Sequence, residues 1–177
     1  MKRILILNYL DSSKPGGISK VVREFAKGLG ILNYEVMTLQ PMPPEDDTDG
    51  EFQHFRKDGA RMPFGIHHYQ IGDIGRIAKV VRSFSPNIIN VHGSRNILTP
   101  LVVIKLKQMF PEIPIVYSPH HDIQSGITFS GKYLFWAHKL ALLNRAYRKS
   151  DLITVCSEFE KKEVAKCVGN TSRKIVI

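Results

Sequence analysis

The sequence of 177 residues is poor in cysteine and has no long apolar run. Cys156 and Cys167 lack metal-binding spacing and are too few for a disulfide scaffold, so we expect two reduced thiols. No stretch of about 18 apolar residues exists that would predict a membrane-spanning helix. The first residues, Met1 to Asp11, turn polar too soon for a secretory signal. These features favour a cytoplasmic protein.

Several motifs that identify common enzyme sites are also missing. The sequence has no G-x-G-x-x-G fingerprint for nicotinamide or flavin, no Walker loop G-x-x-x-x-G-K-[ST], and no G-x-S-x-G hydrolase elbow. It has no H-x-x-x-H or H-x-H pair. A cluster of His120, His121 and Asp122, with His92, leaves a zinc or iron hydrolase as an alternative.

The chain is strongly basic, with a formal net charge of +9 and a pI near 9.6. Its basic residues are spread along the sequence, with small clusters at Lys2-Arg3, Lys161-Lys162 and Arg173-Lys174. No nucleic-acid-binding motif accompanies them, so we expect no nucleic-acid partner. Attraction to phosphorylated substrates, or a peripheral contact with an anionic membrane, remains open.

What the sequence does have is a regular alternation of short apolar runs and segments with helical spacing. The runs predict strands at 4–7, 34–39, 66–71, 88–91, 114–117, 151–155 and 174–177. The periodic segments predict helices at 18–29, 74–84, 98–109, 133–147 and 157–167, with a capping box at Ser157 and Glu160. The proline-rich and acidic stretch 40–63 resists regular structure. The alternation predicts one α/β domain over 1–177, a doubly wound, mainly parallel, Rossmann-like sheet of six or seven strands with helices on both faces.

The first strand and the helix behind it are joined by a long loop that ends in Gly16 and Gly17. Their backbone N–H groups can approach a ligand closely, and the positive end of the helix dipole lies behind them. We therefore expect Gly16 and Gly17 to contact an anion or a sugar. The alternative is that the two glycines only allow a tight turn.

In a doubly wound sheet, ligands bind beyond the carboxyl ends of the strands, where the strand order reverses. His120 follows Pro119 at such an end, and a neutral imidazole there can donate a hydrogen bond to a sugar or stabilise a developing charge. A loop histidine bonded to backbone is the alternative. His92 takes the matching position one unit earlier. The remaining candidates for binding hydroxyls or phosphate lie in the same exit loops: Arg95, Asn96, His121 and Asp122.

Four segments in this order resemble the amino-terminal domain of the group 1 (family 4) retaining glycosyltransferases, which have the two-domain GT-B fold. They are the loop ending in Gly16-Gly17 with its Val21-Val22 helix, the run 86–92, the run 115–120, and the run 150–158. The resemblance implies that Gly16 and Gly17 lie against the donor diphosphate or the acceptor. It also implies that His120 borders the reacting sugar.

The resemblance further implies transfer of a sugar from a nucleotide sugar to a carbohydrate or lipid-linked acceptor, with retention and without a metal or other cofactor. Family members are about twice as long, as two domains require, and their carboxyl-terminal domain supplies most of the donor site. We therefore expect this chain to be the acceptor-side half of such an enzyme, to lack the donor domain, and to be inactive alone. The alternative is a stand-alone domain that binds a sugar phosphate or nucleotide without catalysis.

Overall fold

The computed structural model describes residues 1–8, 17–40, 53–54, 72–93, 98–120, 133–168 and 175–177. The strands are β1 (Arg3–Asn8), β2 (Glu35–Gln40), β3 (Gln53–His54), β4 (Ile88–His92), β5 (Ile115–Ser118), β6 (Leu152–Thr154) and β7 (Ile175–Val176). The helices are α1 (Gly17–Ile31), α2 (Asp73–Phe84), α3 (Leu98–Met109), α4 (Tyr133–Lys149) and α5 (Glu158–Val168). None of the described helices is long and apolar enough to cross a membrane.

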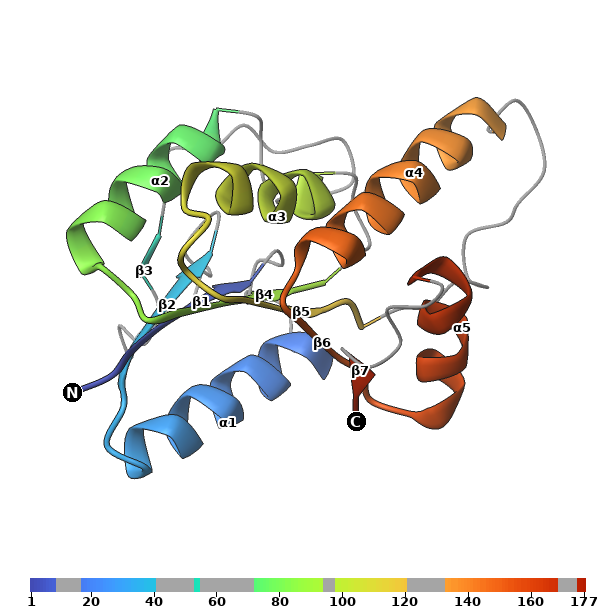
Figure 1. Cartoon of the computed structure of the whole chain (residues 1–177). Coiled ribbons are helices and arrows are strands. Elements are labelled where there is room, and N and C mark those ends of the chain that lie inside the picture. Colours follow the sequence, from blue (N-terminus) through green and yellow to red (C-terminus); the bar gives the residue numbers. More distant parts are fainter. Residues whose placement is uncertain (9–16, 41–52, 55–71, 94–97, 121–132, 169–174) are drawn as a thin grey trace.

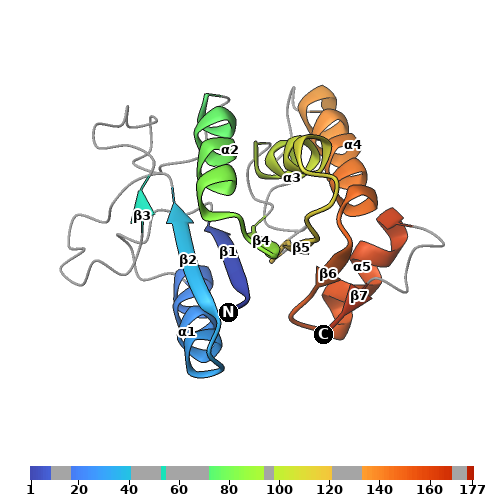
Figure 2. The same cartoon turned by 60° about the vertical axis from the view of Figure 1, so that its left-hand side comes forward.

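The strands form one parallel sheet in the order β3-β2-β1-β4-β5-β6-β7. Figure 2 shows them side by side, with β3 at one edge and β7 at the other. The chain moves from β1 toward β3 and then from β4 toward β7, so the strand order reverses between β1 and β4. This is the doubly wound α/β fold that the alternation predicts. The carboxyl ends of β1 and β4 flank the point of reversal, where Asn8 is in register with His92.

Opposite directions of travel place the connecting helices on opposite faces, because each crossover is right-handed. Figure 1 shows α2, α3 and α4 above the sheet and α1 below it. Helix α5 packs beside α4 and β7 at the edge of the sheet. The helices therefore cover both faces of the sheet, as predicted. On its own face, however, α1 packs mainly against β1 and β2.

The core reflects this unequal cover. The larger apolar cluster lies between the sheet and α2, α3, α4 and α5, and Leu5, Ile89 and Tyr117 are among its fully buried members. The smaller cluster joins Ile4, Ile6 and Val22 between β1 and α1. Successive residues of a strand point to opposite faces, so β1 contributes to both clusters.

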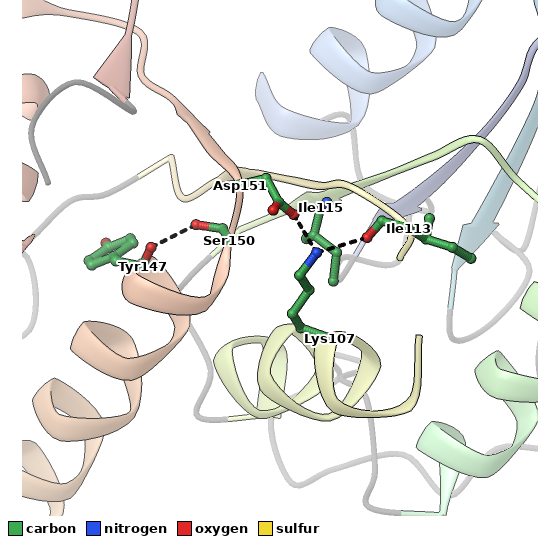
Figure 3. A network of polar contacts seen from close by, with 6 residues as sticks. All are labelled: Lys107, Ile113, Ile115, Tyr147, Ser150 and Asp151. Atoms are coloured by element: carbon green, nitrogen blue, oxygen red, sulfur yellow. Dashed lines mark hydrogen bonds and ion pairs between the residues drawn. The ribbon is translucent and has the colours of Figure 1, made fainter. Parts of the chain in front are cut away.

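Asp151 fixes the start of β6 against two neighbouring elements (Figure 3). Its Oδ2 accepts a 2.8 Å hydrogen bond from the backbone N–H of Ile115 in β5 and lies 2.8 Å from Lys107 Nζ in α3. Lys107 also donates to the carbonyl of Ile113. One carboxylate thus joins β5, β6 and α3, and helps to hold the strands that lead into the candidate site.

The structure departs from the sequence predictions in one strand. Gln53–His54 pairs in parallel with β2, inside the stretch predicted to be irregular. That prediction was wrong there, because pairing with the edge of an existing sheet stabilises two residues that no local pattern favours. The strand predicted at 66–71 lies outside the described residues.

Candidate functional site

An open groove of about 440 Å³ lies on the α1 side of the sheet, where α1 leaves β4, β5 and β6 uncovered. Val21 and Phe25 of α1 form one wall, and their side chains are 45% and 42% exposed. Val21 and Phe25 belong to the apolar spacing that predicts the helix at 18–29, but they line the groove and are not packed on the sheet. The other lining residues are Ile4, Leu29, Tyr34, Ile88, Asn90, His92, Val116, Ser118, His120, Leu152, Thr154, Val155 and Cys156.

The floor of the groove changes character along the strands. At the amino ends of β4 and β6 and along β5, Ile88, Val116 and Leu152 face it. Two residues further along each strand the floor is polar, and Ser118 Oγ donates to Asn90 Oδ1 at 3.2 Å and lies 2.5 Å from Thr154 Oγ1. The polar groups thus gather toward the carboxyl ends, the edge where such sheets bind ligands.

Two histidines, His92 and His120, lie at the polar end of the groove floor, where β4 and β5 end. His92 Nδ1 lies 2.8 Å from His120 Nε2, their ring centroids are 5.1 Å apart, and the ring planes differ by 17°. Two rings stacked face to face cannot bring a pair of nitrogens this close. The two nearly parallel rings therefore lie edge to edge, in almost the same plane. The two rings therefore share one hydrogen bond.

Cys156 and Glu160 support the far side of His120. Cys156 Sγ lies 3.4 Å from His120 Nδ1, within reach of a hydrogen bond to sulfur. The backbone N–H of Cys156 donates to Glu160 Oε2 at 2.8 Å, and the N–H of Glu160 donates to Ser157 Oγ at 3.1 Å. Ser157 therefore caps α5 as predicted. Glu160 reaches back to Cys156, one residue before the cap.

Burial keeps this group of side chains uncharged. Burial and then the neighbouring His120 lower the pKa of His92 from 6.5 to about 3, because a charged imidazole loses its hydration there. Burial also lowers the pKa of His120, against the opposing pull of Glu160. The pKa of the Cys156 thiol is raised by burial and by Glu160. Near neutral pH the group therefore consists of two neutral imidazoles and a protonated thiol.

The backbone at the ends of β4 and β5 is shaped to bring the two imidazoles together. His120 has a φ of 48°, a left-handed conformation that costs a non-glycine residue some free energy and that often marks functional sites. Gly93 has a φ of 94°, and its N–H donates to the carbonyl of Ser118 at 2.7 Å. The buried hydroxyl of Tyr117 donates to the Gly93 carbonyl at 3.0 Å. Gly93, directly after β4, is thus held by two residues of β5.

A family model described as Glycosyltransferase Family 4 matches residues 15–177 of the chain. The match covers nearly the whole sequence. The chain belongs to glycosyltransferase family 4. No curated protein matches its sequence at a significant level.

Solved structures similar to this family 4 domain share its fold at low sequence identity. Sucrose-phosphate synthase from Thermosynechococcus elongatus aligns with a TM-score of 0.66 and 13% identity, over 93% of this chain and 44% of that one. UDP-GlcNAc 2-epimerase from Methanocaldococcus jannaschii aligns with a TM-score of 0.59 and 17% identity, over 100% and 45%. Phosphomethylpyrimidine kinase from Clostridium difficile 630 aligns with a TM-score of 0.58 and 14% identity, over 96% and 63%. The fold alone thus occurs with different reactions, and the chain spans less than half of the first two structures.

The structure brings together two of the residues that the sequence predicts for the site of this family 4 domain. His92 and His120 are in direct contact, while Gly17 opens α1 and is exposed. Gly16, Arg95, Asn96, His121 and Asp122 lie outside the described residues. Among the residues that are described, no three His, Cys, Asp or Glu side chains are arranged to hold a metal ion.

Sequence reasoning missed Cys156, which was expected only to be a reduced thiol. It is indeed a free cysteine, as is Cys167. The position of Cys156 in the sequence could have indicated its contact with His120. Cys156 comes two residues after β6, as His120 comes two residues after β5, and parallel neighbouring strands bring such residues to the same edge of the sheet. The same alignment accounts for Thr154 beside Ser118.

Proposed function

We propose that this family 4 domain is the acceptor-side half of a retaining glycosyltransferase. The enzyme would transfer a sugar from a nucleotide sugar to a carbohydrate or lipid-linked acceptor, without a metal ion or other cofactor. The two free cysteines favour the cytoplasm as its compartment. Family membership supports the class of reaction.

The observation that carries the proposal is the contact between His92 and His120 beside the reversal of strand order. This is where open α/β sheets bind ligands. Neutral imidazoles at such a position bind hydroxyl or phosphate oxygens, and they do so without repelling a sugar cation that develops during transfer. The apolar groove beside them, about 440 Å³ in volume, offers room for the body of an acceptor.

We further propose that transfer needs a second domain that binds the donor. The similar sucrose-phosphate synthase is more than twice as long as the part that this chain matches. We expect the isolated chain to show no turnover with a panel of nucleotide sugars and candidate acceptors, measured by release of the nucleoside diphosphate. Robust turnover by the isolated chain would contradict the need for a second domain.

Sequencing the encoding gene beyond the codon of Ile177 separates the proposal from its alternative. An open frame that encodes a second α/β domain agrees with a two-domain transferase. A stop codon at that point would favour a stand-alone domain that binds a sugar phosphate or nucleotide.

Replacing His120 by alanine in the two-domain protein should lower kcat by roughly 100-fold, as expected for a group that aligns hydrogen bonds at a reacting centre. The variant should leave the KM for the donor little changed, because the proposal places most donor contacts in the other domain. Steady-state kinetics with both substrates measure the two constants separately. Lys79→Ala is the control, because Lys79 is an exposed residue of α2, the helix on the opposite side of the sheet from α1. A His120→Ala variant with the wild-type kcat would remove His120 from the site.

A further inference from the structure

His120 is held between two partners, and this restricts where its proton lies. Its Nε2 is 2.8 Å from His92 Nδ1 and its Nδ1 is 3.4 Å from Cys156 Sγ. A neutral imidazole carries one N–H group and one lone pair. Two arrangements therefore satisfy both contacts. In the first, the thiol donates to His120 Nδ1, and His120 Nε2–H donates to His92. In the second, His120 Nδ1–H donates to the sulfur of Cys156, and His92 Nδ1–H donates to His120 Nε2.

The chemistry at Cys156 favours the first arrangement. The thiol is a weak donor and a weak acceptor, but the unprotonated imidazole nitrogen is the strongest acceptor of the group, so we expect S–H to donate to it. The thiol also keeps its proton, because burial and the carboxylate of Glu160 both raise its pKa. Glu160 accepts the backbone N–H of Cys156 and so holds the residue in place beside His120.

The first arrangement also determines where the proton of His92 lies. His92 Nδ1 accepts from His120, so the proton of neutral His92 must lie on Nε2. That nitrogen is buried and has no hydrogen-bond partner among the residues that the structure describes, while the His92 side chain, only 3% exposed, is part of the groove lining. A buried donor without a partner is rare in native proteins. An oxygen atom that enters beside His92 could supply this missing partner.

We propose that Cys156 is a positioning residue, whose thiol fixes the tautomer of His120 and thereby leaves His92 Nε2–H as the donor for a sugar hydroxyl or phosphate oxygen that enters beside it. His92 then acts as a hydrogen-bond donor and not as a general base. The identity of the ligand oxygen rests on the proposed function. The tautomers assigned to His92 and His120 rest only on their contacts with each other and with Cys156.

Long-range ¹H–¹⁵N correlation spectra of the ¹⁵N-labelled chain test the tautomers directly, at a pH where both histidines are neutral. We expect both His92 and His120 to be protonated at Nε2 and unprotonated at Nδ1. Cys156→Ala should remove the bias, so that the ring nitrogens of His120 report a mixture of tautomers. Cys156→Ser should restore the wild-type pattern, because a hydroxyl also donates.

Cys167→Ala is the matched control, since Cys167 is the other free cysteine and lies near the end of α5. It should leave both histidine patterns unchanged. A proton on Nδ1 of either histidine in the wild-type chain would overturn the proposal, whether or not any variant folds. A wild-type pattern in Cys156→Ala would overturn the role of Cys156.

In the two-domain protein, Cys156→Ala should lower kcat by roughly tenfold, which corresponds to the loss of about one hydrogen bond. Cys156→Ser should recover most of it. Full activity of Cys156→Ala would overturn the positioning role. Absence of turnover in every form, wild type included, would count against the proposed function instead, because the tautomers are read without any reaction.

Discussion

Lowering the pH from about 7 to about 4 should reduce the free energy of unfolding by about 3 kcal/mol through His92 alone. The pKa of this histidine is about 3 in the folded protein, because burial and His120 disfavour its charge, and its ordinary value is 6.5. Between those values the unfolded chain binds the proton more readily than the folded chain does. Stability from this source is therefore complete above about pH 6.5 and is lost as the pH falls toward about 3.

The charged groups near His92 do not reverse this expectation. His120 is its direct neighbour, and its own pKa is lowered by burial, so its effect has the same sign. Glu160 acts on His120 and opposes that effect without outweighing it. The two imidazoles thus act together as an acid-sensitive element between β4 and β5.

Urea unfolding curves of the wild type and of His92→Asn, each measured between pH 7 and pH 4, isolate the contribution of His92. The asparagine variant keeps a polar side chain but cannot gain a proton in this range. Its stability should fall less on acidification, by roughly the 3 kcal/mol assigned to His92. Identical losses in the two proteins would show that the buried histidine does not carry the effect.

The sequence predicted the fold and the positions of two site residues, His92 and His120, for the same physical reason. A parallel sheet brings the carboxyl ends of its strands to one edge, so residues that directly end β4 and β5, such as His92 and His120, are placed by the strand pattern. The alternation of strands and helices also predicts that helices cover both faces of the sheet. No knowledge of side-chain packing is needed for either step.

The rest depended on contacts that no local pattern encodes. Cys156 sits on the same edge, but a single cysteine has too many ordinary roles to attract attention without His120 beside it. Val21 and Phe25 carry the helical spacing of a packed face, yet α1 is too far toward β1 to bury them. The strand at Gln53–His54 exists because β2 offers an edge to pair with. In each case the partner lies in a distant segment.

The polar floor and its histidines also depend on the opposite face of the sheet. Tyr117 lies on the core side of β5, fully buried, between residues that face the groove. Its hydroxyl donates to the carbonyl of Gly93, directly after His92, and its ring lies 5.6 Å from that of Tyr147. Stability and the position of His92 are therefore linked through one side chain.

Tyr117→Ala should lower the free energy of unfolding by about 3–5 kcal/mol, since it removes a large buried ring and leaves a cavity. Tyr117→Phe should cost about 1 kcal/mol, because it keeps the ring but leaves the carbonyl of Gly93 without this donor. Chemical denaturation at pH 7 measures both changes, provided that the denaturant slope stays constant.

Tyr147→Phe is the matched control for the hydroxyl. Tyr147 is almost as deeply buried as Tyr117, but its hydroxyl has no hydrogen-bond partner in the described part of the chain, so removing that oxygen removes no bond there. It should be neutral or slightly stabilising, because a buried polar atom without a partner is itself unfavourable. Equal losses from the two Tyr→Phe changes would show that the bond to Gly93 contributes nothing. A loss confined to Tyr117→Phe, together with altered ring signals of His92, would show that the core of the sheet holds the candidate site in place.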